Sequence, residues 1–327
     1  MSRKHKRLLR KILSWSGIFF FALAVFMIYR QLAKYSLEDI KNAVIEVPNK
    51  SIFYACIASL CGYIALSSYD FLALKYIKHK LATWKWMFAG FIGFSVSNNA
   101  GHAVVSGGAI RYRLYTRWRI PASDIVKIVT FSGFTYLIAC FFLVIVGFLC
   151  SPQHLLTTMS TRYVNMALLA LSVGGLLIYF WGCMFYKKPI IIKEIEFDTP
   201  SPRMALAQML IGSADILMAS LVLYFIMENY VDIPFFTFIG VFIIAQLLGI
   251  YSQVPGGLGI FEVVFTNLLP NEENQAKLFA ILILYRIIYY LLPLLISGII
   301  LIAYELSRSE RKSYKKIKNN VDNHKDT

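Results

Sequence analysis

Long apolar stretches without charge dominate this sequence and restrict the folds open to it. Several runs of 18 or more residues contain no Asp, Glu, Lys or Arg, and about 20 such residues form a helix that crosses the hydrocarbon core of a bilayer. Of the 327 residues, 58% are hydrophobic and 16% are charged, whereas soluble domains carry about 25% charged residues. A soluble enzyme, a secreted module and a disordered regulator are therefore excluded.

The apolar runs predict an all-α polytopic membrane protein with about six full spans. These fall at Ile12–Tyr29, Ser51–Leu74, Asp124–Cys150, Tyr163–Phe185, Met204–Met227 and Leu278–Tyr304. Six basic residues precede the first run but no small-residue cleavage site follows it, so we interpret it as a retained helix. The predicted parts are a basic N-terminus (1–11), a transmembrane domain (12–304, with halves 12–150 and 163–304) and a basic tail (305–327).

Two further apolar segments, Trp86–Ala109 and Phe235–Leu269, are interrupted by glycine and proline, which break helices and allow the chain to reverse. Basic loops flank the first segment on both sides, so we expect it to enter from the cytoplasm and return there. Acidic loops flank the second, so we expect it to enter from outside and return. Irregular backbone at membrane depth requires a protein interior or a watery cavity. The second half then repeats the order of spans and re-entrant segments of the first half in the opposite membrane orientation, as in an inverted repeat. Ordinary kinked spans are the alternative.

Basic residues concentrate on one predicted side of the membrane. The chain carries 33 Lys and Arg against 18 Asp and Glu, a net charge of +15. If both termini are cytoplasmic, 26 of the basic residues lie in inner segments and six in outer ones. The positive-inside rule and attraction to anionic headgroups account for this surplus. We therefore expect both termini in the cytoplasm, phospholipids as partners and no nucleic-acid partner; the oligomeric state is left open.

The first interrupted segment predicts a phosphate site. Small polar residues, amides and glycines there leave backbone N–H groups free to face a ligand, and the positive end of a following helix favours an anion. The residues are Asn98, Asn99 and the presumed break at Gly107 and Gly108. Arg111 and Arg113 follow directly, and a planar guanidinium binds phosphate through two parallel bonds. Arg117 shares a helical face with Arg113, and we interpret it as a cytoplasmic anchor.

The second interrupted segment turns at Pro255, Gly256 and Gly257 and then carries a carboxylate where the first carries arginine. A carboxylate in lipid is costly unless it is solvated or paired. Glu262 therefore needs a partner, and Arg286 on the next span is the candidate. Two interpretations stay open: the ion pair only fixes the fold, or it lines a cavity and opens to a zwitterionic or cationic headgroup.

Asp215 is a further buried acid, and the small residues before it predict that it faces other helices. Asp70 is either buried or merely interfacial. His102 is a proton relay or a structural hydrogen-bonding group. Most Tyr, Trp and Phe residues are expected at lipid-facing or interfacial positions. The sequence shows no nucleophile–base pair, metal-ligand spacing, CxxC motif or nucleotide loop, so we assign no catalytic residues, metal or cofactor.

The two glycine-containing motifs resemble those of the lysylphosphatidylglycerol synthase transmembrane family. They are Ser97-Asn98-Asn99 with Gly107 to Tyr115, and Val254-Pro255-Gly256-Gly257-Leu258-Gly259-Ile260-Phe261-Glu262. That family includes the flippase half of multiple peptide resistance factor and stand-alone YbhN-like proteins. The resemblance covers roughly residues 12–304 and implies a flippase-like fold that moves phospholipids, with Arg111, Arg113 and Glu262 as cavity residues. The resistance factor has a large soluble synthase domain, whereas only a short polar tail follows here, so no aminoacyl transfer is expected.

Together with this resemblance, these observations favour a phospholipid translocator of a bacterial inner membrane that handles an anionic or aminoacylated headgroup. In this hypothesis the arginines of one half and Glu262 of the other hold the headgroup while the acyl chains stay in lipid. Two alternatives remain. One is a transferase acting on a lipid carrier, and the other is a membrane subunit that anchors a separately encoded synthase or envelope enzyme.

Overall fold

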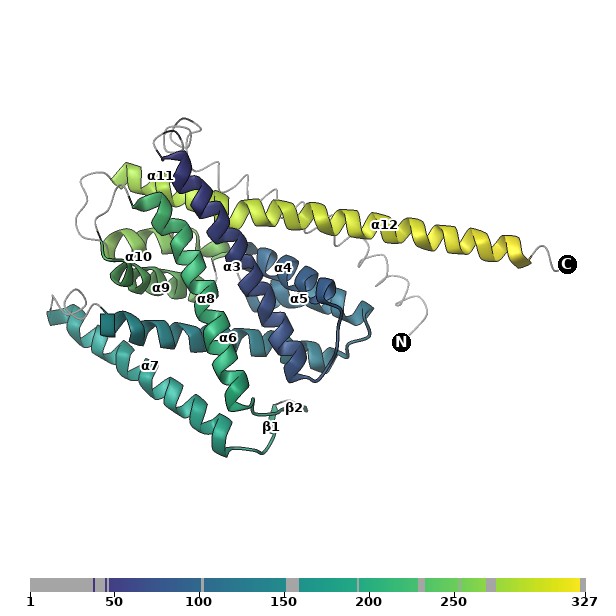
Figure 1. Cartoon of the computed structure of the whole chain (residues 1–327), viewed down its shortest axis with the longest axis horizontal. Helices are drawn as coiled ribbons and strands as arrows, with labels where there is room; N and C mark the ends of the chain where they lie inside the picture. Colours follow the sequence, from purple (N-terminus) through teal and green to yellow (C-terminus); the bar gives the residue numbers. More distant parts are fainter. Residues whose placement is uncertain are drawn as a thin grey trace.

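The structure, a computed structural model, describes residues 38, 45, 47–100, 103–150, 159–192, 194–228, 233–252, 254–268 and 275–323. Helices make up most of these residues (Figure 1). In chain order the helices are α3 (Asn49–Tyr76), α4 (Thr83–Ala100), α5 (Ala103–Arg117), α6 (Ala122–Cys150), α7 (Met159–Phe185), α8 (Pro202–Met227), α9 (Phe235–Tyr251), the 3-10 turn η1 (Pro255–Gly257), α10 (Ile260–Leu268), α11 (Gln275–Arg286), the π-turn η2 (Ile287–Leu291) and α12 (Leu292–Asn323).

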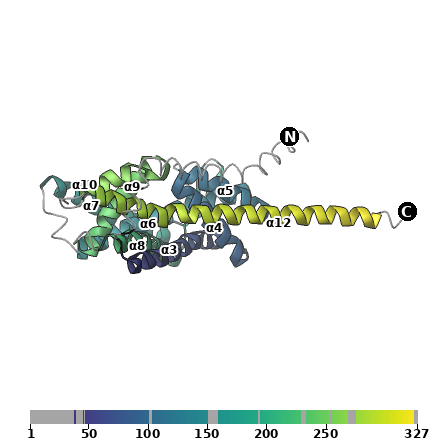
Figure 2. The same ribbon diagram turned by 90° about the horizontal axis from the view of Figure 1, so that it is seen from above.

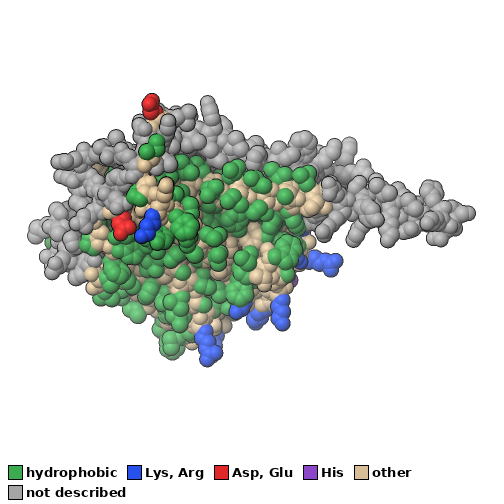
Figure 3. Space-filling view, turned by 45° about the horizontal axis from the view of Figure 1, so that its top comes forward, with side chains coloured by type: hydrophobic (Ala, Val, Ile, Leu, Met, Phe, Trp, Pro, Cys, Tyr) green, Lys and Arg blue, Asp and Glu red, His purple; other side chains and the backbone are tan. Residues whose placement is uncertain are grey.

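Five helical stretches of the described residues are long and apolar enough to cross a membrane. They are Asn49–Tyr76, Ala122–Cys150, Asn165–Phe185, Pro202–Met227 and Ile281–Ser307, and each contains most of one predicted span. The predicted first span, Ile12–Tyr29, lies outside the described residues. Hydrophobic side chains cover much of the face shown in Figure 3, and Lys and Arg gather along its lower edge. The protein is therefore an integral membrane protein, and the total of six crossings stays a prediction.

Close helix packing in the bundle depends on small residues, as is usual between membrane helices. Helix α3 runs alongside α8, and α6 also packs on α8. A Cβ on Gly212 of α8 would lie 2.6 Å from the Ala139 Cβ of α6, so only glycine allows this approach. Likewise, a Cβ on Gly90 of α4 would lie 2.8 Å from the Ser67 Cα of α3. These contacts bring α3, α4, α6 and α8 together around one interior.

Both interrupted segments form pairs of short helices that pack side by side, α4 with α5 and α9 with α10. At 1.5 Å per residue these helices are about 27, 23, 26 and 14 Å long. The second break lies where the sequence predicts it, with Gly256, Gly257 and Gly259 at positive φ values of 61°, 62° and 82°. Glycine is needed at these three positions because other residues rarely adopt such backbone angles.

The first break does not lie at Gly107–Gly108, so that prediction is wrong. Helix α4 ends at Ala100 and α5 begins at Ala103, which places both glycines inside α5. A Cβ on Gly107 would overlap the Ser97 hydroxyl and lie 2.9 Å from the Gly93 carbonyl oxygen. Gly107 is therefore required for close packing of α5 on α4, and not for the reversal of the chain.

The last predicted span is interrupted by the π-turn η2, which the sequence analysis did not predict. Its wider turn leaves carbonyl oxygens that side chains of α3 and α4 satisfy. Ser59 Oγ donates to the Ile288 oxygen at 3.1 Å, Tyr63 Oη to the Tyr289 oxygen at 3.1 Å, and Asn99 Nδ2 to the Tyr290 oxygen at 3.1 Å. Beyond η2, helix α12 extends well past the bundle (Figure 2).

A small β-hairpin joins α7 to α8 and interrupts an otherwise helical fold among the described residues. Strand β1 (Ile190–Ile192) pairs antiparallel with β2 (Ile195–Phe197), with Ile192 opposite Ile195. Three consecutive isoleucines favour extended backbone because they are β-branched. The turn contains Glu194 at a φ of 67°.

Candidate functional site

A central cavity of about 340 Å³ lies inside the bundle, among α3, α4, α5, α6, α8, α9 and η2. A smaller cavity of about 80 Å³ adjoins it beside η1. Both are lined by Ser97, Asn98, Gln246 and Ile250. These four residues come from the ends of α4 and α9, so the cavities meet where the two pairs of short helices approach each other. A Cβ on Gly256 would lie 3.7 Å from the Asn98 carbonyl oxygen.

Asp215 contributes a carboxylate to the central cavity from the middle of α8. Its side chain is 3% exposed and accepts hydrogen bonds from Tyr69 Oη at 2.8 Å and Tyr289 Oη at 3.3 Å. No Lys or Arg of the described residues forms an ion pair with it. Since charged groups at membrane depth usually pair or serve function, Asp215 marks the polar centre of this cavity. Its predicted contact with other helices is confirmed.

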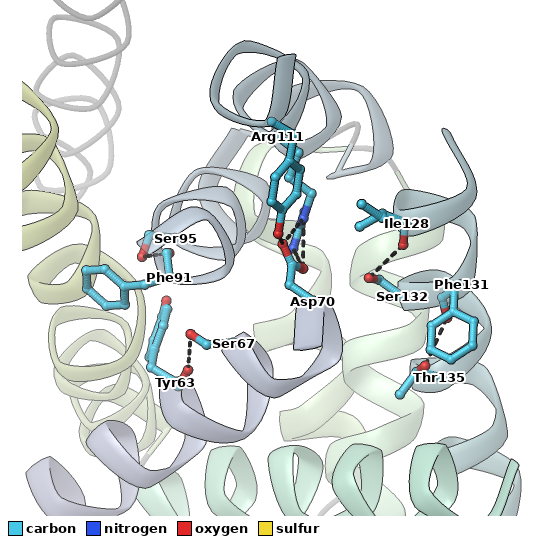
Figure 4. A network of polar contacts seen from close by, with 11 residues as sticks. Tyr63, Ser67, Asp70, Phe91, Ser95, Arg111, Ile128, Phe131, Ser132 and Thr135 are labelled. Carbon is cyan, nitrogen blue, oxygen red and sulfur yellow. Dashed lines mark hydrogen bonds and ion pairs between the residues drawn. The ribbon is translucent and has the colours of Figure 1, made fainter. Parts of the chain in front are cut away.

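Arg111 lines the same cavity, but its charge is balanced within the protein (Figure 4). From α5 it reaches Asp70 on α3, with Nε 3.0 Å from both carboxylate oxygens and Nη2 2.8 Å from Oδ1. Tyr115 Oη donates to Oδ2 of the same carboxylate at 2.6 Å. Asp70 is fully buried and Arg111 is 3% exposed. The interfacial interpretation of Asp70 is therefore wrong, and the sequence analysis missed this pair.

Glycine makes room for the Arg111 guanidinium. A Cβ on Gly93 would lie 3.1 Å from Cζ of Arg111, and one on Gly107 would lie 3.2 Å from its Nη1. The Phe94 ring also packs against the guanidinium, with the ring centroid 4.2 Å from Cζ, a distance at which a cation is attracted to a ring face. Residues of α4 and α5 thus pack closely around the Arg111 side chain.

The expected contact between Glu262 and Arg286 is confirmed. Arg286 Nε donates to Glu262 Oε1, and Nη1 donates to the Gly256 carbonyl oxygen at 2.7 Å. The other Glu262 oxygen accepts from the Gly259 N–H at 2.8 Å. The ion pair therefore holds both sides of the second helix break. Neither side chain is among the residues that line the two cavities, so the geometry favours a structural role.

Arg113 lies away from the central cavity and contacts the last helix. Its Nη2 donates to Glu305 Oε1 at 2.9 Å, and Arg117 Nη1 donates to the same oxygen. The two arginines share one helical face, as the sequence predicts, but both connect α5 to α12. The predicted role of Arg113 in a cavity finds no support in this placement.

The predicted amides and glycines fall into two groups. Asn98, Gly256 and Gly257 line the smaller cavity. Asn99 instead connects α4 to η2, because Nδ2 donates to the Ser95 oxygen at 2.8 Å and to the Tyr290 oxygen. Neither Gly107 nor Gly108 is among the lining residues, and Pro255 begins η1. His102 lies outside the described residues.

Several tyrosines of the interior were missed by the sequence analysis. Tyr69 and Tyr289 are 1% and 2% exposed, so the expectation that most aromatic residues face lipid or the interface is wrong for them. Hydroxyl groups of α3, α4 and α6 also bond locally: Ser67, Ser95, Ser132 and Thr135 each donate to the carbonyl four residues earlier (Figure 4). Ser59, Tyr63 and Ser67 recur every four residues along α3, and this polar stripe is the signal that could have identified its buried face.

Comparison with known proteins assigns the chain to a family. Residues 14–297 match the family described as Lysylphosphatidylglycerol synthase TM region. The chain belongs to this family. It is 30% identical over 321 residues to Inner membrane protein YbhN of Escherichia coli, covering 95% of this chain and 97% of the relative. It is also 30% identical over 305 residues to the Synechocystis protein slr0712, covering 92% and 94%.

Longer relatives share only this region. The chain is 27% identical over 299 residues to a phosphatidylglycerol lysyltransferase of Staphylococcus xylosus, and the match covers 90% of this chain but 34% of the relative. The resemblance stated from the glycine motifs is thereby confirmed at the level of the family.

Among the residues that the structure describes, no cluster of His, Cys, Asp and Glu is suited to a metal ion.

Proposed function

We propose that the protein translocates a phospholipid whose headgroup passes through the central cavity. The observation that carries this proposal is the Asp215 carboxylate, which faces a cavity of about 340 Å³ inside an apolar bundle with no basic partner among the described side chains. A volume of this size lies within the range of about 300–1,000 Å³ typical of small-molecule sites. It accommodates a headgroup while the acyl chains stay in the bilayer.

The charges around the cavity favour a headgroup that carries an amine. Arg111 is neutralised by Asp70, and Arg286 by Glu262. In its ionised form Asp215 then contributes one negative charge, which is complementary to an ammonium group of an aminoacylated or zwitterionic lipid. The amides of Asn98 and Gln246, which also line the cavity, offer donors for the phosphate. This arrangement replaces the expected phosphate site at Arg111 and Arg113.

The two pairs of short helices support an alternating mechanism. We propose that α4–α5 and α9–α10 are re-entrant, one from each side, and that they form the two halves of an inverted repeat. The end of α4 and the turn η1 meet at the smaller cavity. Rocking of one half against the other would expose the headgroup to each leaflet in turn.

The location and partners follow from the same proposal. The described basic loops lie at the α3–α4, α5–α6 and α7–α8 connections, which supports cytoplasmic termini in a bacterial inner membrane. Phospholipids are the proposed partners, and a separately encoded synthase that supplies an aminoacylated lipid is a further one. We propose transport without chemical conversion of the lipid.

Reconstitution into liposomes tests the proposal. Fluorescent lipids in the inner leaflet become accessible to dithionite only after translocation, so the bleached fraction measures transport. We expect faster bleaching of an ethanolamine-bearing lipid with the protein than in protein-free vesicles, and slower bleaching with Asp215→Asn. Glu196→Gln on the exposed face of β2 is the matched control. Bleaching no faster than in empty vesicles would refute transport and leave the transferase or anchoring alternatives.

A further inference from the structure

A third cavity, of about 440 Å³, lies on a different face of α6 from the central one. Lys127, Phe131 and Phe134 of α6 line it, whereas Val129, Ser132 and Tyr136 line the central cavity. The two cavities share no lining residue. Helix α7 and the β1–β2 hairpin, which lies at the lower end of the bundle in Figure 1, also line this third cavity.

Gln208 lies at the inner end of this cavity, and both polar atoms of its side-chain amide have hydrogen-bond partners. Gln208 is fully buried. Its Oε1 accepts from Tyr179 Oη at 2.6 Å, and its Nε2 donates to Thr135 Oγ1 at 2.9 Å. Most of the remaining wall is aromatic or aliphatic. A hydrocarbon chain therefore fits this interior without leaving the Gln208 amide unpaired.

The side of the cavity opens between two helices that are apolar enough to cross the membrane. Its lining includes Phe134 of α6 and Ile178 and Trp181 of α7, which are 50%, 73% and 60% exposed. Because these exposed faces belong to candidate spans, the molecules that reach the opening are those of the bilayer. The position of the opening therefore favours a membrane lipid as the occupant.

The end nearest the hairpin is polar. Thr199 lines the cavity, and its Oγ1 is buried without a hydrogen-bond partner in the described part of the chain. Lys127 lines the same cavity, is partly exposed, and has its Nζ 3.6 Å from Asp124 Oδ1 on the same helix. Tyr76 Oη donates to the Asp198 carbonyl oxygen at 2.6 Å and thereby holds the loop that carries Thr199. A buried hydroxyl without a partner is costly, so this end is suited to a ligand oxygen.

We propose that this cavity binds one membrane glycerophospholipid as a resident ligand, separate from the transported one. One acyl chain occupies the space between α6, α7 and α8. An ester or phosphate oxygen accepts from the Thr199 hydroxyl, and the Lys127 ammonium lies beside the phosphate. The site stabilises α7 against α6 and α8, and it does not depend on the transport proposal.

Gly182 gives a direct test because it lines the cavity and a Cβ there would meet no atom within 4 Å. Gly182→Trp fills the cavity with a side chain and leaves the backbone unstrained. Gly174 lies on the same helix, also has open space and is not a lining residue, so Gly174→Trp is the matched control. Both proteins are purified in mild detergent, and retained lipid is counted by native mass spectrometry.

We expect one retained phospholipid per copy in the wild type and in Gly174→Trp, and its loss in Gly182→Trp. Crosslinking with a phospholipid that carries a diazirine on one acyl chain should label α6 and α7 peptides around the cavity. Equal retention in both tryptophan variants would overturn the proposal, because it would show lipid bound all around the protein. Labelling by a diazirine fatty acid but not by the phospholipid would also overturn it.

Thr199→Val keeps the side-chain shape and removes the hydroxyl, so it tests the polar end if the tryptophan variant fails to fold. Loss of one hydrogen bond, roughly 1 kcal/mol, corresponds to about a fivefold weaker retention in detergent dilution. Retention equal to that of the wild type would contradict the proposed contact. Transport of labelled lipid through the central cavity is measured separately, so failure of either proposal leaves the other standing.

Discussion

The buried pair of Asp70 and Arg111 offers the most quantitative test of the structure. Asp70→Leu removes the acceptor of three Arg111 contacts and leaves a guanidinium that is 3% exposed. Breaking a buried pair in this way costs about 3–5 kcal/mol. Arg111→Met should cost a similar amount, because it leaves a fully buried carboxylate whose remaining side-chain donor is Tyr115.

The double variant Asp70→Leu/Arg111→Met should be far more stable than the sum of the single variants implies. Replacing both charges by apolar groups is often neutral, so the remaining cost is that of the Tyr115 hydroxyl, about 1–3 kcal/mol. Adding Tyr115→Phe should recover most of it. Unfolding by SDS in mixed micelles, followed by far-UV circular dichroism, measures each variant. A double variant as unstable as either single one would refute the reasoning.

The same variants separate the two interpretations of Arg111. If the guanidinium only stabilises the fold, a stable double variant should translocate lipid at a rate close to that of the wild type. A folded double variant without transport would show that Arg111 acts on the headgroup. That result would contradict the assignment of headgroup recognition to Asp215.

Three further results are expected. Gly107→Ala should lower the unfolding midpoint strongly because its Cβ overlaps the Ser97 hydroxyl, whereas Gly108→Ala, with no atom nearer than 3.8 Å, should change it little; equal midpoints would contradict the packing of α5 on α4. Tyr63→Phe should cost about 1 kcal/mol in the same assay, because the Tyr289 carbonyl of η2 loses its donor. Arg286→Met should increase hydrogen exchange at the second helix break, because Glu262 and the Gly256 carbonyl lose their partner; unchanged exchange at residues 256–262 would argue against that role.

The positions of five spans and of the second helix break could be predicted because each depends on local sequence. Long uncharged runs define the spans. Gly256, Gly257 and Gly259 define the break, because their positive φ angles are rarely adopted by other residues. The ion pair of Glu262 and Arg286 was also predictable, because a carboxylate in an apolar segment is costly unless it is solvated or paired, and Arg286 on the next span offered a cation.

The remaining features depend on which helices become neighbours, and one sequence does not determine this. Gly107 looked like a helix break, yet its role follows from the Ser97 side chain of α4. Asp70 and Arg111 are 41 residues apart, and no local pattern connects them. Arg113 and Arg117 share a face, but Glu305 of α12 gives that face its partner.

The dependence of transport on headgroup charge tests the central claim most directly. The measurement is the ratio of translocation rates for an ethanolamine-bearing lipid and for phosphatidylglycerol, in wild type and in Asp215→Asn. The account predicts a preference for the amine in the wild type that disappears in the variant, since Asp215 is the unpaired charge of the cavity among the described residues. The same ratio in both proteins, with transport intact, would contradict it.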